Sequence, residues 1–417
     1  MLRFNENNEV ITEEHYSAIL VGLIRDKDSR RSIEELEGLA EAAGVTVAGI
    51  MTQKAEKPNT ATFIGKGKVE ELAEAVSTME ADTVIFDDEL TGMQMRNLEE
   101  ATGARVIDRK ILILDIFAAR AASKEGKLQV ELAQLKYRLA RLVGLRSSLS
   151  RLGGGIGTRG PGEKKLEMDR RLIKDRIAQL NRELAEVKRH REVIRSKRSR
   201  EHVSVAAIVG YTNAGKSTLL NTLTGASVLE EDQLFATLDP TTRMLILPGN
   251  QKILLTDTVG FISKLPHNLI EAFRSTLEEA KYADMILHVA DLSNPQMEEQ
   301  MHVTYETLRE LGVLNKTVIT VFNKCDKASE EILIRDFQAD AKVIVSAKTG
   351  EGLDRLQALL EDWVREQRME IKRLYPYTEA GKIQLIRAYG EVCKEEYQEE
   401  GIYIEGFVPS ELYTKVN

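Results

Sequence analysis

The stretch Gly210-Tyr211-Thr212-Asn213-Ala214-Gly215-Lys216-Ser217 decides the fold of this 417-residue chain. It follows an apolar run over 203–209, which predicts a buried strand, and precedes residues 218–223, which predict the start of a helix. A glycine-rich loop ending in Gly-Lys-Ser between a strand and a helix is typical of a phosphate-binding P-loop. Its backbone N–H groups point at phosphate oxygens, its lysine adds a positive charge, and its serine hydroxyl can bind Mg²⁺. The alternative is a glycine-rich turn that carries a lysine by chance, and the flanking strand and helix count against it.

Length and composition bound the class of protein. A chain of 417 residues exceeds one ordinary core, so we expect two to four domains. The longest apolar run, residues 111–122, is interrupted by Asp115 and Arg120 and is too short for a membrane span. The polar, acidic start (residues 1–14) predicts no signal peptide, and two distant cysteines fit a reducing cytoplasm. We therefore expect a cytoplasmic protein, and the net charge of −8 gives no overall indication of nucleic acid.

Three further motifs each follow a predicted strand, at the carboxyl edge where parallel sheets bind ligands. They are Asp257-Thr258-Val259-Gly260, Asn323-Lys324-Cys325-Asp326 and Ser346-Ala347-Lys348. In the first, the aspartate can hold the Mg²⁺ shell through water and the glycine N–H can contact the γ-phosphate. In the second, the carboxylate can accept hydrogen bonds from the ring N–H and the amine of guanine, whereas adenine would leave that charge unpaired. Residues 203–366 therefore predict a GTP-binding domain.

Two features of this domain bear on hydrolysis. The segment Phe235-Ala236-Thr237-Leu238-Asp239 lies between the P-loop helix and the strand before Asp257. A threonine there can reach Mg²⁺ and order the loop only while a γ-phosphate is bound. Phe261 stands where many GTPases carry a water-positioning glutamine, and a phenyl ring cannot hydrogen-bond water. We therefore expect slow hydrolysis unless a partner, another loop or an ion helps.

The predicted site residues share a place around the bound nucleotide. The predicted catalytic residues are Lys216, Thr237, Asp257 and Gly260. The predicted GTP-binding residues are Gly210, Tyr211, Thr212, Asn213, Ala214, Gly215, Lys216, Ser217, Phe235, Ala236, Thr237, Leu238, Asp239, Asp257, Thr258, Val259, Gly260, Asn323, Lys324, Cys325, Asp326, Ser346, Ala347 and Lys348.

The rest of the chain predicts three more domains in an overall α/β fold. Residues 1–121 alternate between strand and helix patterns, which predicts a small parallel sheet flanked by helices. Within them, Gly65-Lys66-Gly67-Lys68 lacks the P-loop spacing and favours a basic turn before a helix over a second phosphate loop. Residues 122–200 predict a long antiparallel helical hairpin packed along leucine seams. Residues 370–417 predict a small α/β domain with a helix over 389–400.

The tip of the predicted hairpin is rich in glycine and surrounded by basic residues. Glycines let a backbone approach a partner closely, and arginines and lysines neutralise phosphates. We therefore predict RNA backbone contacts here, for which the candidates are Gly154, Gly155, Arg159, Lys164 and Lys165. The alternative is a solvated helical face with i,i+4 ion pairs, because acidic residues are interspersed.

With these motifs the sequence resembles the HflX family, bacterial GTPases related to the Obg group, over essentially its whole length. The most specific stretches are Gly-Gly-Gly-Ile-Gly-Thr-Arg-Gly-Pro-Gly-Glu at 153–163, Phe-Ala-Thr-Leu-Asp-Pro-Thr-Thr-Arg at 235–243, Asp-Thr-Val-Gly-Phe at 257–261 and Gly-Lys-Gly-Lys at 65–68. The resemblance implies Mg²⁺-dependent GTP hydrolysis with Ser217 and Thr237 as metal ligands. It also implies binding to the large ribosomal subunit and its RNA, and separation of stalled ribosomes into subunits.

Three further expectations remain open at this point. In related GTPases that lack the glutamine, an asparagine at the place of Asn213 helps to hold K⁺, which makes K⁺ a second candidate cofactor. We expect a monomer. The alternative functions are a regulatory switch that acts on a protein effector without RNA, and a metabolic P-loop kinase, which would need no guanine-reading motif.

Overall fold

The chain forms two compact units in the computed structural model. The structure describes residues 3–4, 10–11, 16–152, 161–200, 203–225, 234–235, 240–248, 251–264, 279–313, 315–328 and 335–417. The first unit comprises residues 1–184 with the short segments 232–236 and 263–272, and the second comprises the remainder. Within the described residues, every helix is too short or too polar to cross a membrane.

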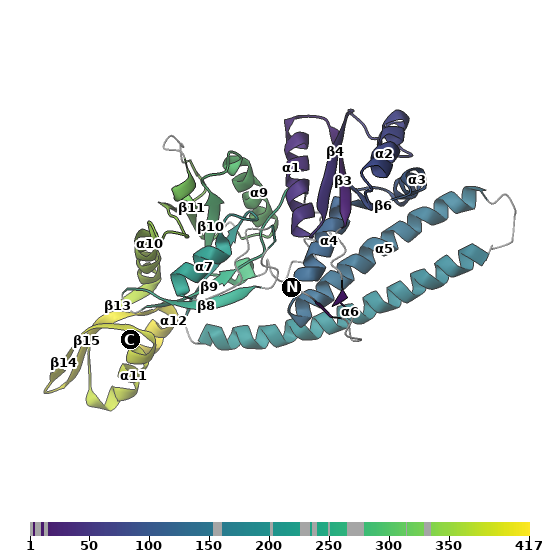
Figure 1. Cartoon of the computed structure of the whole chain (residues 1–417). Coiled ribbons are helices and arrows are strands. Elements are labelled where there is room, and N and C mark those ends of the chain that lie inside the picture. The colour runs from purple at the N-terminus through teal and green to yellow at the C-terminus, as the bar shows by residue number, and fades with distance from the viewer. Residues whose placement is uncertain are drawn as a thin grey trace. The chain divides into compact units, whose positions relative to one another are not determined.

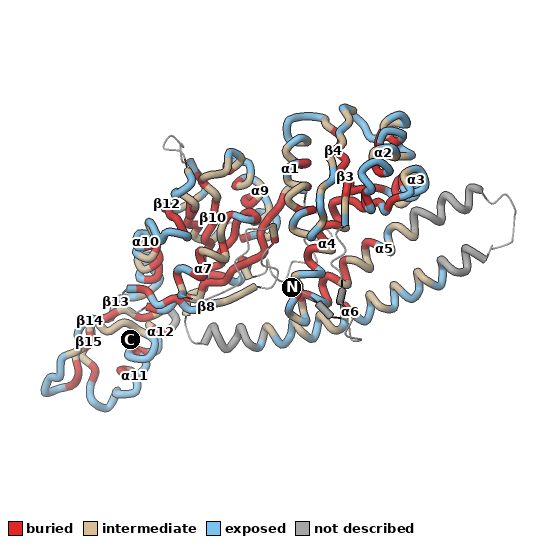
Figure 2. Tube along the Cα trace, in the orientation of Figure 1, coloured by how far each residue is buried: buried red, intermediate tan, exposed pale blue. Residues whose placement is uncertain are grey.

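The first unit contains the predicted small parallel sheet (Figure 1). Its strands run in the order β4-β3-β5-β6, all parallel: β3 (Ser17–Ile24), β4 (Thr46–Lys54), β5 (Thr83–Phe86) and β6 (Arg105–Asp108). The helices between and after them are α1 (Lys27–Ala42), α2 (Lys66–Thr78), α3 (Gly92–Thr102) and α4 (Arg109–Arg120). Figure 2 shows the buried residues gathered on the central strands, because apolar side chains there face helices on both sides.

Local hydrogen bonds explain where these helices begin. Asp26 caps α1 by accepting a bond from the Ser29 N–H at 2.8 Å, and Thr91 and Gln94 form a reciprocal capping box on α3. Gly65 precedes α2 and its N–H donates to Gln53 Oε1 at 2.9 Å. The basic segment 65–68 is therefore the N-cap and first turn of α2 itself, where a turn before the helix was predicted, and the Gly65 N–H is already engaged.

The short strands β1 (Arg3–Phe4) and β2 (Val10–Ile11) pair with each other near the N-terminus.

Two long helices, α5 (Lys124–Leu152) and α6 (Pro161–Arg200), follow α4. Helix α5 packs against α3 and α4, and Arg176 of α6 forms a two-point ion pair with Glu131 of α5, at 2.7 and 2.9 Å. The predicted leucine seam of α6 is wrong at Leu172, whose side chain is 61 % exposed, because the apolar face of α5 is covered by the α/β domain instead.

The second unit is built on a six-stranded sheet in the order β12-β11-β10-β7-β9-β8. The parallel strands are β7 (Ser204–Gly210), β9 (Lys252–Asp257), β10 (Met285–Asp291), β11 (Thr317–Asn323) and β12 (Ala341–Ile344), and β8 (Thr241–Ile246) is an antiparallel edge strand that the sequence did not predict. Around it lie α7 (Lys216–Thr224), α9 (Met297–Glu310), η1 (Cys325–Lys327) and α10 (Leu353–Glu366). The parallel strands place the predicted motifs together at the carboxyl ends of the strands.

The C-terminal part of this unit is a three-stranded antiparallel sheet. Strand order is β13-β15-β14, with β13 (Arg368–Tyr375), β14 (Glu391–Gln398), β15 (Gly401–Pro409), η2 (Tyr377–Glu379), α11 (Ala380–Tyr389) and α12 (Ser410–Val416). The predicted helix over 389–400 is wrong, because those residues form β14. Their glutamates and lysine favour a helix locally, but pairing with β15 in a tight hairpin outweighs that propensity.

Candidate active site

The P-loop connects β7 to α7 as predicted, and its first and last glycines leave no room for a side chain. Gly215 has a φ of +89°, and a Cβ there would lie 2.3 Å from Asn323 Nδ2. Gly210 has a φ of +153°, and its Cβ would meet the Val289 carbonyl oxygen at 2.2 Å. Glycine is therefore required at both ends of the loop.

Lys216 is buried at the start of α7. Its Nζ donates to the Tyr211 carbonyl at 2.8 Å, within the loop itself. Burial lowers the pKa of Lys216 to about 8, against the opposing effect of the Asp257 carboxylate. A phosphate placed in this loop would supply the anion that the buried lysine needs.

Ser217 and Asp257 provide hard oxygen ligands on the same side of the loop. Ser217 Oγ donates to Asp257 Oδ2 at 2.7 Å, and Asp257 is fully buried. The Thr212 hydroxyl is also buried and has no hydrogen-bond partner in the structure. Mg²⁺ prefers hydroxyl, carboxylate and phosphate oxygens, so this donor set fits the ion. Within the described residues no cluster of three His, Cys, Asp or Glu side chains forms another metal site.

The segment after Asp257 is held against the P-loop. The Thr212 N–H donates to the Phe261 carbonyl at 2.8 Å, and the Phe261 N–H donates to the Gly210 carbonyl at 3.1 Å. A Cβ on Gly260 would lie 2.8 Å from Thr212 Cα and 2.9 Å from Lys216 Nζ. Gly260 therefore lies where its N–H can contact a phosphate next to the lysine. Thr258 and Val259 are buried, and the Thr258 hydroxyl donates to the Ile208 carbonyl at 2.8 Å.

The two base-reading motifs come together beside the loop. Asn323 Nδ2 donates to the Ala214 carbonyl and Asn323 Oδ1 accepts from the Ala347 N–H, each at 2.9 Å. Ser346 Oγ donates to Asp326 Oδ1 at 2.7 Å, which orients the carboxylate. Asn323 thus ties the P-loop to the segment 346–348.

One contact beside these motifs was missed from the sequence. Lys324 Nζ pairs with Asp291 Oδ2 at 2.8 Å, at the end of β10. Lys324 also has a φ of +64°, so both backbone and side chain are fixed. The only signal in the sequence is an aspartate that ends the apolar run 285–290. Cys325 Sγ lies 3.7 Å from Glu351 Oε2, and Lys348 is exposed.

Some predicted residues lie elsewhere or outside the described residues. Phe235 belongs to the first unit, where its buried ring packs edge-on against Phe117, with centroids 4.6 Å apart. The remaining predictions concern residues that the structure does not describe, or helix residues whose side chains it does not describe: Ala236, Thr237, Leu238, Asp239, Gly154, Gly155, Arg159, Lys164 and Lys165.

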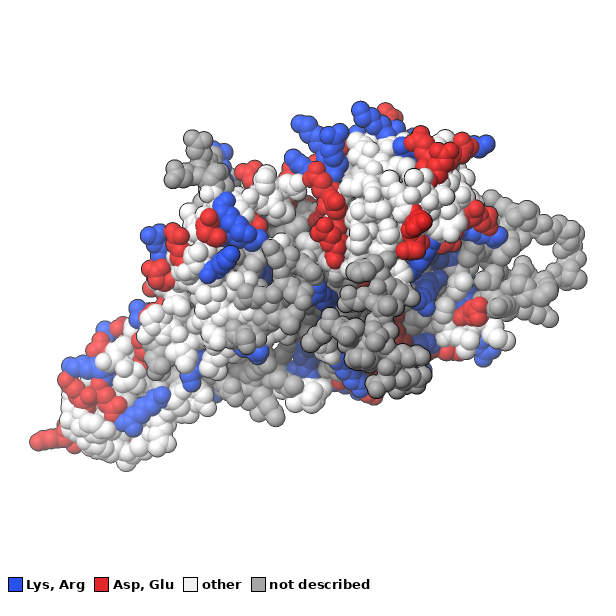
Figure 3. Space-filling model, viewed as in Figure 1, with Lys and Arg blue, Asp and Glu red and all other residues white. Residues whose placement is uncertain are grey.

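Some basic residues of helices α5 and α6 are exposed to solvent, and others form ion pairs within the protein. Arg138, Arg171 and Lys174 are exposed. Arg141 instead pairs with the buried Asp108 at 2.7 Å, and Arg176 pairs with Glu131. Figure 3 shows basic and acidic side chains mixed over the described surface in this view.

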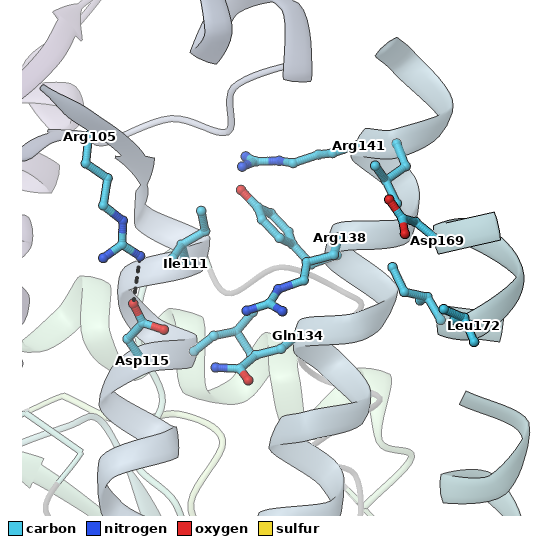
Figure 4. A pocket seen from close by; sticks show the side chains of 12 residues that line it. Arg105, Ile111, Asp115, Gln134, Arg138, Arg141, Asp169 and Leu172 are labelled. Carbon is cyan, nitrogen blue, oxygen red and sulfur yellow. Dashed lines mark ion pairs between the residues drawn. The ribbon is translucent and has the colours of Figure 1, made fainter. Parts of the chain in front are cut away.

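A pocket of about 590 Å³ lies within the first unit, between α4, α5 and α6 (Figure 4). Its lining surface is mostly apolar, and two of its arginines lie beside carboxylates. Arg105 lies 3.9 Å from Asp115, and Arg141 stacks on the Tyr137 ring at 3.8 Å while it pairs with Asp108. Burial raises the pKa of Asp115 despite the nearby arginines. The lining therefore favours no class of ligand.

Comparison with known proteins covers nearly the whole chain. Three family models match: "GTP-binding GTPase N-terminal" over residues 30–118, "GTP-binding GTPase Middle Region" over 120–198 and "50S ribosome-binding GTPase" over 205–324. The GTPase HflX of Lacrimispora saccharolytica is 61 % identical over 97 % of this chain and 96 % of its own length. That of Escherichia coli K12 is 44 % identical over 86 % and 85 %.

A solved structure is also similar. A GTP-binding protein from the archaeon Sulfolobus solfataricus, in complex with GDP, is 28 % identical, with a TM-score of 0.46, and the match covers 83 % of this chain and 98 % of that one. The P-loop between β7 and α7, the matching family models and identities of 44–61 % over at least 85 % of each chain lead to the same assignment. The chain belongs to the HflX family of GTPases.

Proposed function

We propose that this GTPase binds the large ribosomal subunit in its GTP state, contacts ribosomal RNA with the α5–α6 hairpin, and helps to separate stalled ribosomes in the cytoplasm. The observation that carries the proposal is the match of residues 205–324, which include the P-loop, to a family described as 50S ribosome-binding GTPases. The exposed basic residues of α5 and α6 support it, because phosphate contacts supply most of the affinity for RNA.

The chemistry of the site follows from its own side chains. Lys216 neutralises the β- and γ-phosphates, Gly260 donates its N–H to the γ-phosphate, and Asp326 selects guanine. Ser217 and Thr237 would hold Mg²⁺, with Asp257 in its outer shell, and the ion would supply positive charge to balance the charge that develops on the phosphates. Since Phe261 cannot orient water, hydrolysis on the isolated chain is slow and the ribosome accelerates it.

K⁺ is a second cofactor in this proposal. Asn213 is exposed on the P-loop with a φ of +60°, so its side chain is available beside the phosphates. Hydrolysis measured in KCl and in NaCl at equal ionic strength tests this point. Faster turnover in KCl, abolished by Asn213→Ala, is the expected result, and equal rates would remove K⁺ from the account.

Co-sedimentation with purified ribosomal subunits tests the proposed partner. The chain should sediment with large subunits in the presence of a non-hydrolysable GTP analogue and remain in the supernatant with GDP. If RNA phosphates supply the contacts, the logarithm of the affinity should fall steeply with the logarithm of the salt concentration. A protein effector would give a shallow salt dependence and no sedimentation with subunits, which would favour the alternative of a regulatory switch.

Variants at the hairpin tip separate ribosome contact from nucleotide chemistry. Gly154→Val, Gly155→Val and Arg159→Ala should each reduce ribosome-stimulated hydrolysis and leave intrinsic hydrolysis unchanged. A branched side chain blocks close backbone approach, and loss of one phosphate contact should lower the salt slope by about one unit. Gly381→Val is the matched control, because Gly381 is exposed in α11 and a Cβ there meets nothing within 4 Å. Unchanged stimulation in all three tip variants would contradict a role for the tip.

A further inference from the structure

The P-loop contains a buried hydroxyl group without a partner. Thr212, the third residue of the loop, is 5 % exposed, and its Oγ1 has no hydrogen-bond partner in the structure. A buried hydroxyl without a partner destabilises a fold, and a valine would fill the same space without that cost. The fold by itself therefore gains nothing from a hydroxyl at this position, and a bound molecule can supply the missing partner.

The backbone of Thr212 is fixed against the segment that follows β9. Its N–H donates to the Phe261 carbonyl at 2.8 Å, and the Phe261 N–H donates to the Gly210 carbonyl at 3.1 Å. These two bonds form a parallel bridge between Tyr211 and Phe261. The backbone therefore sets the position of Thr212 relative to Gly260, the residue before Phe261.

The side chain of Thr212 lies beside two groups that we assign to the γ-phosphate. A Cβ built on Gly260 would be 2.8 Å from the Thr212 methyl carbon, Cγ2, and 2.9 Å from Lys216 Nζ. Because no hydrogen bond holds the hydroxyl, one rotation about the Cα–Cβ bond to another staggered rotamer brings it to the place of that methyl group. The hydroxyl can therefore reach the space next to Lys216 and Gly260.

The neighbouring side chains are either unsuited to hold water or already engaged. Phe261 carries no hydrogen-bonding group, and its ring is buried. The Ser217 hydroxyl donates to Asp257 Oδ2 at 2.7 Å, and the Thr258 hydroxyl donates to a backbone carbonyl of β7 at 2.8 Å. The Thr212 hydroxyl is thus the group in this part of the described site that is available to bond water and phosphate.

We propose that Thr212 is a catalytic residue for GTP hydrolysis, whose hydroxyl accepts a hydrogen bond from the attacking water and donates one to a γ-phosphate oxygen. A hydroxyl can donate and accept at once, so it can hold the two reacting groups together. Water attacks the γ-phosphorus, the bond to the oxygen that bridges to the β-phosphate breaks, and the proton from water passes to the released phosphate. The inference rests on the proposed contacts of Lys216 and Gly260 with the γ-phosphate and does not depend on the ribosome.

Single-turnover hydrolysis of GTP by the full chain in KCl tests this role. Thr212→Val keeps the shape of the side chain and removes the hydroxyl. We expect the rate to fall about thirtyfold, the factor for one hydrogen bond to a charged group. The affinity for GDP should stay unchanged, because GDP has no γ-phosphate, and this also shows that the variant is folded. Thr212→Ser keeps the hydroxyl and should restore most of the rate.

A matched control removes a buried hydroxyl elsewhere in the same domain. Thr304 of α9 is fully buried, and its hydroxyl donates to the Gln300 carbonyl at 2.9 Å. Thr304→Val makes the same chemical change away from the nucleotide, so the hydrolysis rate should match that of the parent. A fall in rate confined to Thr212→Val is the result that the proposal requires.

Binding of a transition-state mimic provides a readout besides turnover. The dissociation constant for GDP with aluminium fluoride in KCl should rise in Thr212→Val by the same factor as the rate falls. A loss of GTP affinity without a loss of rate would overturn the catalytic role. So would a Thr212→Ser variant as slow as Thr212→Val, because packing of the methyl groups would then explain the effect.

Comparison with Gly260→Ala separates this inference from the site on which it rests. A parental rate in Thr212→Val together with slow hydrolysis by Gly260→Ala would overturn the role of Thr212 alone. Parental rates in both variants would overturn the assignment of the γ-phosphate site as well.

Discussion

Gly260 is the site residue at which we expect the addition of a single methyl group to lower kcat strongly. A Cβ there would meet the Thr212 backbone and the Lys216 ammonium, neither of which can move without disturbing the P-loop. We predict that Gly260→Ala lowers kcat by about a hundredfold, because displacements near 1 Å at reacting groups have effects of that size. Gly67→Ala is the control, since a Cβ at that helical position meets nothing within 4 Å. A parental rate in Gly260→Ala would contradict the assignment of its N–H to the γ-phosphate.

Lys216 gives a pH dependence whose sign can be derived. Its pKa in the nucleotide-free chain is about 8, and a bound triphosphate raises it, so binding takes up a proton above pH 8. GTP affinity should therefore fall about fourfold between pH 7 and pH 8.5. Calorimetry in two buffers of different ionisation enthalpy measures the proton uptake directly. Zero uptake at pH 8.5 would show that the lysine is already charged before the nucleotide arrives.

At the scale of elements, β10 and α9 hold a buried histidine that the site does not use. His288 is 1 % exposed, its ring meets Tyr305 edge-on at 4.8 Å, and its Nδ1 has no hydrogen-bond partner in the structure. Burial lowers its pKa to about 4, so the folded chain keeps it neutral where the unfolded chain would protonate it. Stability is therefore lost as the pH falls below the unfolded pKa of about 6.5.

This loss can be measured in the nucleotide-binding domain itself. Between pH 7 and pH 5 the histidine should contribute about 2 kcal/mol to the fall in the free energy of unfolding. The single tryptophan, Trp363 in α10, reports on that domain in urea titrations. His288→Phe keeps an aromatic ring and should remove this part of the fall, whereas His302→Gln, at an exposed position, should leave it unchanged. Equal pH dependence in the parent and His288→Phe would contradict the burial argument.

Elements also show what local sequence could and could not predict. The motifs after β7, β9, β11 and β12 were placed correctly because parallel strands bring their carboxyl ends to one edge whatever the intervening sequence. Strand β14 was predicted as a helix because its glutamates favour helix locally, and that local propensity does not reveal the pairing with β15. Leu172 of α6 was placed in a seam on spacing alone, but the spacing does not say which neighbour covers a helix.

At the scale of the whole molecule, we propose that the nucleotide-binding domain reads guanine and that the hairpin contacts RNA. The meeting of Asn323, Asp326 and Ser346 could be predicted because each follows a strand of one parallel sheet. Contacts such as Lys324–Asp291 and Lys264–Asp87 could not, since they depend on which segments of the chain meet in space.

We propose that the chain recognises guanine nucleotide through Asp326 and hydrolyses it on the large ribosomal subunit. The most direct test measures hydrolysis of GTP and of XTP, with and without purified large subunits, by the parent and by Asp326→Asn. The amide donates where the carboxylate accepted, and xanthine offers the matching carbonyl. We predict that subunits stimulate the parent only with GTP and the variant only with XTP. Hydrolysis by the parent that is indifferent to subunits, or a variant that still prefers GTP, would contradict the account.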